Sequence, residues 1–175
     1  MNPSYFIWSQ NGTMLRGYAN ENWVPGNLVF PVGFPGMVSP VQSLTLQSSA
    51  SAQGSLETFN NVKFYLSGDP ADLALVQGSW PVLGNAYTPA RTDLNGGFEI
   101  SFDGSNYTRF SNTVGLASDP TTWITLPAIA TGSSGANGVL GAYDTAQIFV
   151  RYAIPSSVTT YKTLNIQLAV DADIV

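Results

Sequence analysis

The sequence contains no histidine and no cysteine. Histidine is the commonest general base and the commonest metal ligand, so its absence excludes Ser-His and Cys-His nucleophile arrangements. Without cysteine there is no disulfide, no thiolate-held zinc and no iron–sulfur cluster. The composition therefore leaves carboxylates as the main reactive groups, and we expect no cofactor.

Charge is also scarce, because charged residues make up 10% of the chain, against about 25% in ordinary soluble domains. Nucleic-acid backbones need clustered cations, and no run of about 18 apolar residues occurs, so we expect neither nucleic acid nor membrane as a partner. A charge-poor surface is typical of a subunit packed against neighbours. The basic residues stand singly: Arg16, Lys63, Arg91, Arg109, Arg151 and Lys162.

Residues 1–40 are rich in proline, glycine and apolar side chains, as in "VPGNLVFPVGFPGM". Proline forbids regular helix and removes ladder hydrogen bonds, so this stretch predicts an extended segment. Such a segment lies either over its own domain or on a neighbour. We take the second interpretation and predict an arm over 1–40. Its expected partner contacts are Phe6, Trp8, Trp23, Phe30 and Phe34.

From residue 41 onward the apolar residues alternate with polar ones, which is typical of half-buried strands. Asn-Gly and Asp-Gly turns separate these runs, and Asp103–Asn106 predicts a hairpin between "GFEIS" and "YTRF". No long helical pattern occurs, and the best candidate for a short helical turn is "DPADLALV", where Asp69 could act as the cap. The pattern predicts an all-β fold, an antiparallel β-sandwich of Ig-like or jelly-roll-like type over residues 41–175.

The last segment, "KTLNIQLAVDADIV", alternates without a break over residues 164–174. Its apolar face fixes the strand's orientation, which leaves Asp171 and Asp173 together on the other face. Two such carboxylates can share Ca²⁺ when other oxygens complete the shell, but no EF-hand spacing is present. We therefore interpret them as the solvated face of a terminal strand, where like charges discourage edge pairing.

Two active roles remain open. A carboxylate glycosidase needs two acids about 5–9 Å apart, and Glu99, Asp103, Asp171 and Asp173 offer accidental pairs without singling one out. A glycan-binding or receptor-binding module is the better alternative, because aromatic residues stand in or near loops. Its candidate ligand contacts are Trp80, Tyr87 and Tyr107. Trp123 is followed by Ile124 and Leu126, which have strand spacing, and we expect it to anchor its loop on the core.

Several segments between residues 60 and 175 resemble structural proteins of tailed-bacteriophage virions: "NVKFYLSGD" (61–69), "NGGFEISFDGSNYTRFS" (95–111), "DPTTWITLP" (119–127), "DTAQIFVRYAIP" (144–155) and "LNIQLAVDADIV" (164–175). The last two resemble the closing strand pair of Ig-like modules. The resemblance implies a β-domain that decorates the head or belongs to the tail, neck or baseplate, with arms crossing neighbouring subunits. It carries over no set of functional residues.

Together these observations predict a non-enzymatic virion protein that binds other virion subunits, forms a homo-oligomer, and stabilises or links the particle. The alternative is a carbohydrate- or receptor-binding module of a fibre or adhesin.

Overall fold

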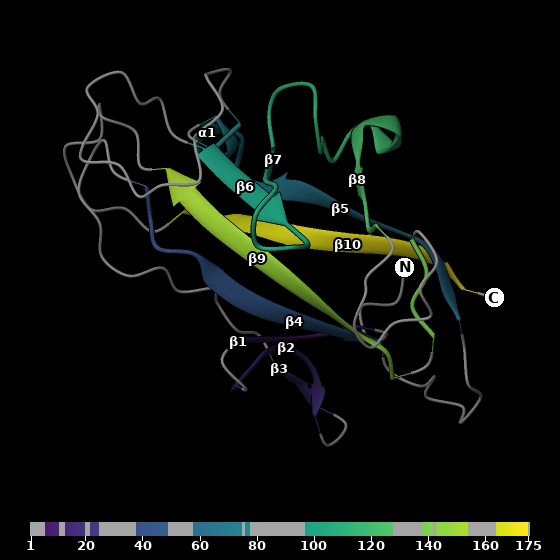
Figure 1. Cartoon of the computed structure of the whole chain (residues 1–175). Coiled ribbons are helices and arrows are strands. Elements are labelled where there is room, and N and C mark those ends of the chain that lie inside the picture. Colours follow the sequence, from purple (N-terminus) through teal and green to yellow (C-terminus); the bar gives the residue numbers. More distant parts are fainter. Residues whose placement is uncertain are drawn as a thin grey trace.

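A computed structural model of the chain describes residues 6–10, 13–19, 22–24, 38–48, 58–74, 76–77, 97–127, 138–141, 143–153 and 164–174. For residues 14–19, 22–24 and 174 it describes the backbone. These ranges form two antiparallel sheets that pack face to face (Figure 1). The predicted all-β antiparallel sandwich is therefore confirmed.

The larger sheet has seven strands in the order β3-β2-β1-β4-β9-β6-β7. Its centre is the antiparallel pair β4 and β9, in which Leu44 lies opposite Ile148. Both are buried, as the alternation predicts for an inward-facing row. The strands are β1 (Phe6–Gln10), β2 (Thr13–Ala19), β3 (Asn22–Val24), β4 (Gln42–Ser48), β6 (Gly97–Ser101), β7 (Thr108–Arg109) and β9 (Thr145–Ala153).

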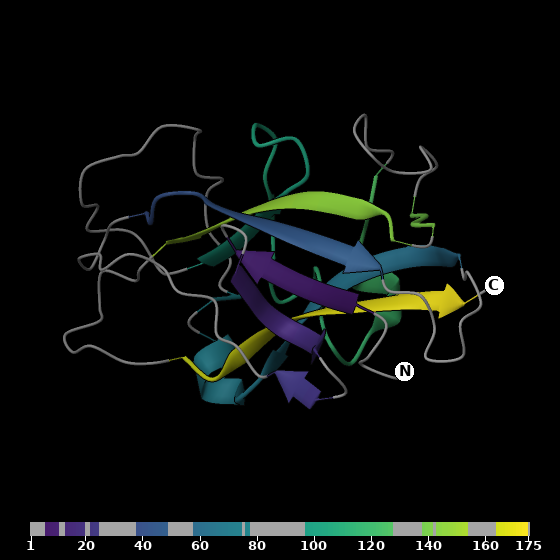
Figure 2. The same cartoon turned by 90° about the horizontal axis from the view of Figure 1, so that it is seen from below.

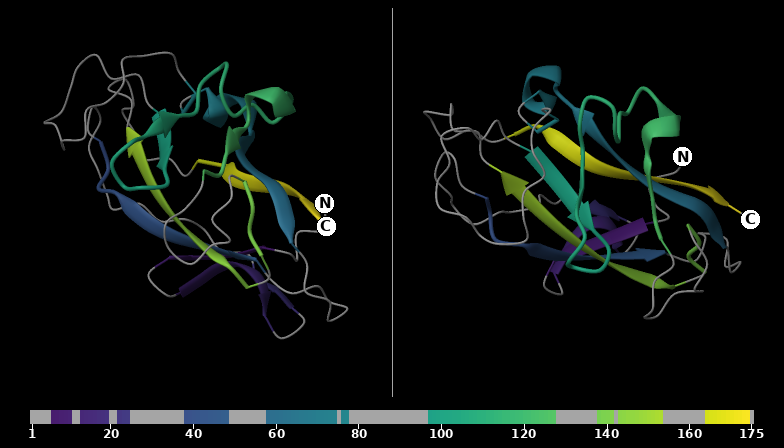
Figure 3. Two further views of the ribbon diagram at one scale, coloured as in Figure 1. Left: turned by 45° about the vertical axis from the view of Figure 1, so that its right-hand side comes forward. Right: turned by 45° about the horizontal axis from the view of Figure 1, so that its top comes forward.

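The smaller sheet has three strands in the order β10-β5-β8. They are β5 (Phe59–Gly68), β8 (Ile124–Thr125) and β10 (Ile166–Ile174). Figure 3 shows β5 and β10 side by side, forming one layer across from β4 and β9. The inward row of β5 is fully enclosed, since Val62, Phe64 and Leu66 are at most 1% exposed.

The candidate helical turn is present, and the predicted hairpin is confirmed. Asp69 caps the short helix α1 (Pro70–Leu73), and its carboxylate accepts hydrogen bonds from the backbone N–H groups of Ala71 and Asp72. Strands β6 and β7 form the predicted hairpin, with Glu99 opposite Arg109. Turn chemistry in the sequence is sufficient to place both features, because each depends on residues close together in the chain.

The N-terminal strand corrects part of the arm prediction. Strand β1 pairs with β4 along its whole length, and Phe6 and Trp8 are 5% and 8% exposed (Figure 2). Phe6 packs on Phe59 at a ring-centroid distance of 5.0 Å, and Trp8 meets Phe64 edge-on at 6.1 Å. Residues 6–10 thus belong to the sandwich of their own chain, and β2 and β3 extend the same sheet beyond β1, so the domain does not begin at residue 41.

Candidate functional site

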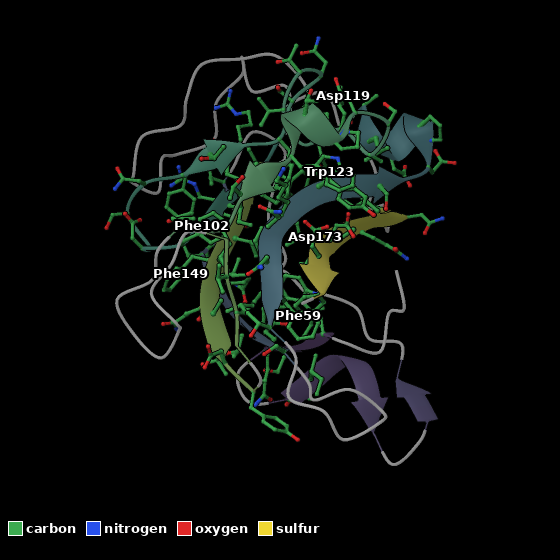
Figure 4. All side chains as sticks on the ribbon, turned by 90° about the vertical axis from the view of Figure 1, so that its right-hand side faces the viewer. Phe59, Phe102, Asp119, Trp123, Phe149 and Asp173 are labelled. Atoms are coloured by element: carbon green, nitrogen blue, oxygen red, sulfur yellow. The ribbon has the colours of Figure 1, made fainter. Side chains whose placement is uncertain are left out.

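Strand β10 is the longest of the described strands that lie at an edge of either sheet. It pairs with β5 from Ile166 opposite Gly68 to Ile174 opposite Phe59. No strand within the described ranges pairs with its other side, so β10 ends the smaller sheet. Figure 4 looks at the end of the molecule where β10 finishes, marked by Asp173. An edge strand of this length is a template for pairing with another chain.

The direction of the backbone groups along β10 follows from Asn165. Its N–H donates to the Asp72 carboxylate and its C=O accepts from the Asp69 N–H, so both groups point toward the β5 side. In an antiparallel ladder these directions alternate with each residue. The N–H and C=O groups of the even-numbered residues therefore point toward the free edge: Ile166, Leu168, Val170 and Ala172.

The side chains of the same even-numbered residues face the core, as the sequence predicts, but the core covers them only in part. With Leu164 just before the strand, the row consists of Leu164, Ile166, Leu168, Val170 and Ala172, all partly buried against the core cluster. The neighbouring row on β5 is completely buried. The apolar interior of the sandwich is thus open along β10, where each further buried CH₂ group would stabilise by about 0.8 kcal/mol.

The outer face of β10 carries Asp171 and Asp173, as expected for a solvated face. Asp171 lies opposite Lys63, and Asp173 accepts a hydrogen bond of 2.6 Å from the Asn61 side-chain amide. The register shifts between the two acids because β5 holds the extra residue there, with Asn61 at φ 53°. Strand β10 itself therefore stays regular. Among the residues that the structure describes, no three acids gather as a metal-holding group.

A second polar cluster lies on the outer face of the larger sheet. Glu99 is 1% exposed and holds two guanidinium groups: Arg151 Nε at 2.6 Å and Arg109 Nη2 at 3.2 Å. Alternation alone places Glu99 and Ser101 on the polar side of β6, yet all five residues of β6 are buried. Both carboxylate oxygens of Glu99 are therefore engaged by arginines, which makes this cluster a structural ion-pair network.

Tyr107, in the loop of the β6–β7 hairpin, covers one side of this cluster. Its ring lies over the Arg151 guanidinium, with 3.8 Å from Cζ to the ring centroid. Burial raises the pKa of the Tyr107 phenol, and the positive charge of Arg151 opposes that rise. One face of the ring is therefore occupied by Arg151, which does not favour the predicted role of Tyr107 as a stacking platform for glycans.

The turn between β6 and β7 is organised by Asp103. Its carboxylate accepts hydrogen bonds from the backbone N–H groups of Asn106 and Ser105, from the Asn106 side-chain amide and from the Ser101 hydroxyl. These donors hold the pKa of the Asp103 carboxyl well below its ordinary value, with the Asn106 backbone N–H contributing most. Asp103 is thus a turn-forming residue with its oxygens already engaged.

This depressed pKa predicts a pH dependence. A carboxyl with a lowered folded pKa stabilises the fold above its ordinary pKa, and the effect disappears as the pH falls through the folded value. We expect the difference in unfolding free energy between wild type and Asp103→Asn to be constant above about pH 5 and to shrink below about pH 4. Urea unfolding at several pH values measures it. A difference that stays constant down to about pH 2 would contradict this assignment.

Trp123 anchors its loop as predicted, but on the outward-facing Tyr65 and not on the core. Its indole N–H donates to the Leu116 C=O at 2.6 Å, and its ring stacks on Tyr65 with a centroid distance of 4.3 Å. Figure 4 shows Trp123 close to Asp119, the residue that caps the 3₁₀ turn Pro120–Thr122. The side chain therefore ties the segment just before β8 to the outer face of β5, the strand with which β8 pairs.

The remaining predicted contacts are only partly described. Trp23 lies in β3, whose backbone pairs it with Tyr18 of β2. Phe30, Phe34, Trp80 and Tyr87 lie outside the described residues. Their predicted roles, partner contact for the first two and ligand contact for the others, stay predictions.

Sequence reasoning missed the two features that define these sites. One is the Glu99–Arg109–Arg151 cluster. The signal in the sequence is that Glu99 and the two arginines occupy polar positions of their strands and have opposite charge. Only the structure shows that β6 lies between β7 and β9. The other is the partly covered apolar row along the β10 edge; the local signal for an edge is the pair Asp171 and Asp173, which does not show that the row is incompletely covered. Edge position depends on sheet order, which links residues far apart in the chain.

The described residues contain no helix long and apolar enough to cross a bilayer. No family model matches the chain, and neither the curated proteins nor the solved structures contain a match.

Proposed function

We propose that this chain is a non-enzymatic structural subunit of a tailed-bacteriophage virion, which binds neighbouring subunits and stabilises or links the particle as a capsid decoration protein or a tail, neck or baseplate component. The observation that carries the proposal is β10, a nine-residue edge strand with a half-covered apolar row. A strand from a neighbouring subunit would complete the hydrogen bonds of β10 and at the same time cover its apolar row.

The charge-poor composition supports the same role. With charged residues at 10% of the chain, little on the surface opposes close packing against a neighbour. The likeness of the segments between residues 60 and 175 to virion structural proteins is the reason for proposing a particle in preference to another assembly. Of the predicted arm contacts, Trp23, Phe30 and Phe34 remain in the proposal, whereas Phe6 and Trp8 belong to the chain's own core.

The test is to purify particles of the phage that encodes this chain, quantify the chain by mass spectrometry, and locate it in an electron-microscopy map. We expect many copies per particle, each seen as a two-sheet sandwich touching its neighbours. Absence of the chain from particles would overturn the proposal. Binding on a glycan array that is lost in Trp80→Ala or Tyr107→Ala would favour the sugar-binding alternative instead.

A further inference from the structure

We propose that β10 is a self-association site, at which two copies of this chain pair antiparallel about a two-fold axis at Ala169. The two smaller sheets would then join into one continuous sheet, with both apolar rows on the same side. This inference rests on the proposed assembly role and names the partner at this edge as a second copy. Four properties of the strand carry it: its free backbone groups, its regularity, its partly buried apolar row and the order of its outer-face side chains.

The backbone groups fit such a pairing. In an antiparallel pair about Ala169, Leu168 lies opposite Val170 of the second copy, and Ile166 lies opposite Ala172. These are the residues whose N–H and C=O groups point to the free edge. Each can therefore exchange hydrogen bonds with its counterpart. The bulge at Asn61 is in β5, so it does not interrupt this ladder.

The apolar row fits as well. Leu168 and Val170 are partly buried in the single chain and would become direct cross-strand neighbours in the pair. The completed core would thus extend from one copy into the next beneath the joined sheet. A polar ligand or an acidic peptide would leave this row half covered, which is why a second apolar-faced strand is the occupant that fits.

The outer face selects the register. About Ala169, Gln167 lies opposite Asp171 of the second copy, and Asn165 lies opposite Asp173, so each acid meets an amide donor. The two Asp171 side chains are then four residues apart along the strands, about 13 Å. If the two-fold axis lay at Val170, the two Asp171 side chains would be diagonal neighbours. If it lay at Asp171, they would be directly opposite each other. Repulsion between the two carboxylates therefore disfavours both of those registers, and it is small in the register with the axis at Ala169.

Gln167 gives the sharpest test, because it is exposed and faces away from the core. In the symmetric pair, residue 167 of each copy lies opposite Asp171 of the other copy. Gln167→Asp therefore places two carboxylates opposite each other at two positions. Gln167→Lys places a lysine opposite a carboxylate at the same two positions. We expect Gln167→Asp to weaken dimerisation on the order of tenfold and Gln167→Lys to tighten it by a few-fold. Sedimentation equilibrium of the full chain over a range of concentrations measures both. The same two substitutions at exposed Gln147 of β9 control for net charge and are expected to leave the dimer unchanged.

A backbone test separates pairing from side-chain effects. The Leu168 N–H points to the free edge, so Leu168→Pro removes two symmetry-related hydrogen bonds of the pair and none to β5. We expect Leu168→Pro to be monomeric. The control is Leu168→Ala, which also loses the leucine side chain but keeps the N–H group, and we expect it to dimerise. The two variants should have similar circular dichroism spectra.

The outcomes distinguish this inference from the proposed function. A monomeric wild type overturns β10 pairing, and if it still joins particles the assembly role stands. A dimer that persists in Leu168→Pro, or that ignores both Gln167 substitutions, uses another surface and also overturns the inference. A β10 dimer that is absent from particles leaves the inference standing and removes the virion role.

Discussion

Replacing Glu99 by glutamine is expected to lower the free energy of unfolding by about 3–5 kcal/mol, because it removes the carboxylate that both arginines share in a buried site. The Glu99 side chain is 1% exposed, and the Arg151 side chain 4%. Water therefore cannot solvate the guanidinium groups that lose their carboxylate partner. The size of the glutamine side chain is the same, so the loss reports charge and hydrogen bonding more than packing. Urea unfolding followed by tryptophan fluorescence measures it.

The matched control is Asp173→Asn, which makes the same acid-to-amide change at an exposed position of the smaller sheet. We expect it to cost less than about 1 kcal/mol, as for other exposed polar groups. Equal losses for the two variants would show that the Glu99 cluster contributes no more than a surface contact. Arg151→Lys is expected to fall between them, since lysine restores the charge without the planar donor group.

The second large effect is expected for Gly68→Ala, at the end of β5. Gly68 has φ 148°, and a Cβ atom there would overlap the Asn165 C=O oxygen and lie 2.8 Å from the Ile166 Cα. Both are backbone atoms of the β10 segment and cannot rotate away. We expect a loss of about 3 kcal/mol or more, combining a strained backbone with a steric overlap, measured by thermal and urea unfolding.

Gly104→Ala isolates the backbone part of this cost. Gly104 also has a positive φ, 74°, but a Cβ there would meet only the Phe149 ring at 3.5 Å, an ordinary contact. We expect a loss of about 1 kcal/mol from conformation alone. If both alanine variants lose the same amount, the close approach of β10 to Gly68 is not a tight contact.

Much of the sandwich can be predicted from single segments. The row Val62, Phe64 and Leu66 is predicted to face inward and is fully buried, because the side-chain period of a strand is a property of the strand itself. The Asp69 cap and the hairpin at Asp103 are likewise predicted, since each involves residues a few positions apart. The arm prediction is wrong for β1, β2 and β3, which are strands of the chain's own larger sheet. A proline-rich composition further along the chain says nothing about where these three strands pair.

The sequence by itself determined the β class, the inward faces of the strands, the turn residues and the exclusion of histidine- and cysteine-based chemistry, because each of these follows from residue type and local order. Only the tertiary structure decided that β1 joins β4, that Glu99 is buried between Arg109 and Arg151, and that β10 lies at an edge. Those features depend on the order of strands in the sheets. Strand order is set by contacts between distant segments competing to bury the same apolar surface, which no single stretch of the chain encodes.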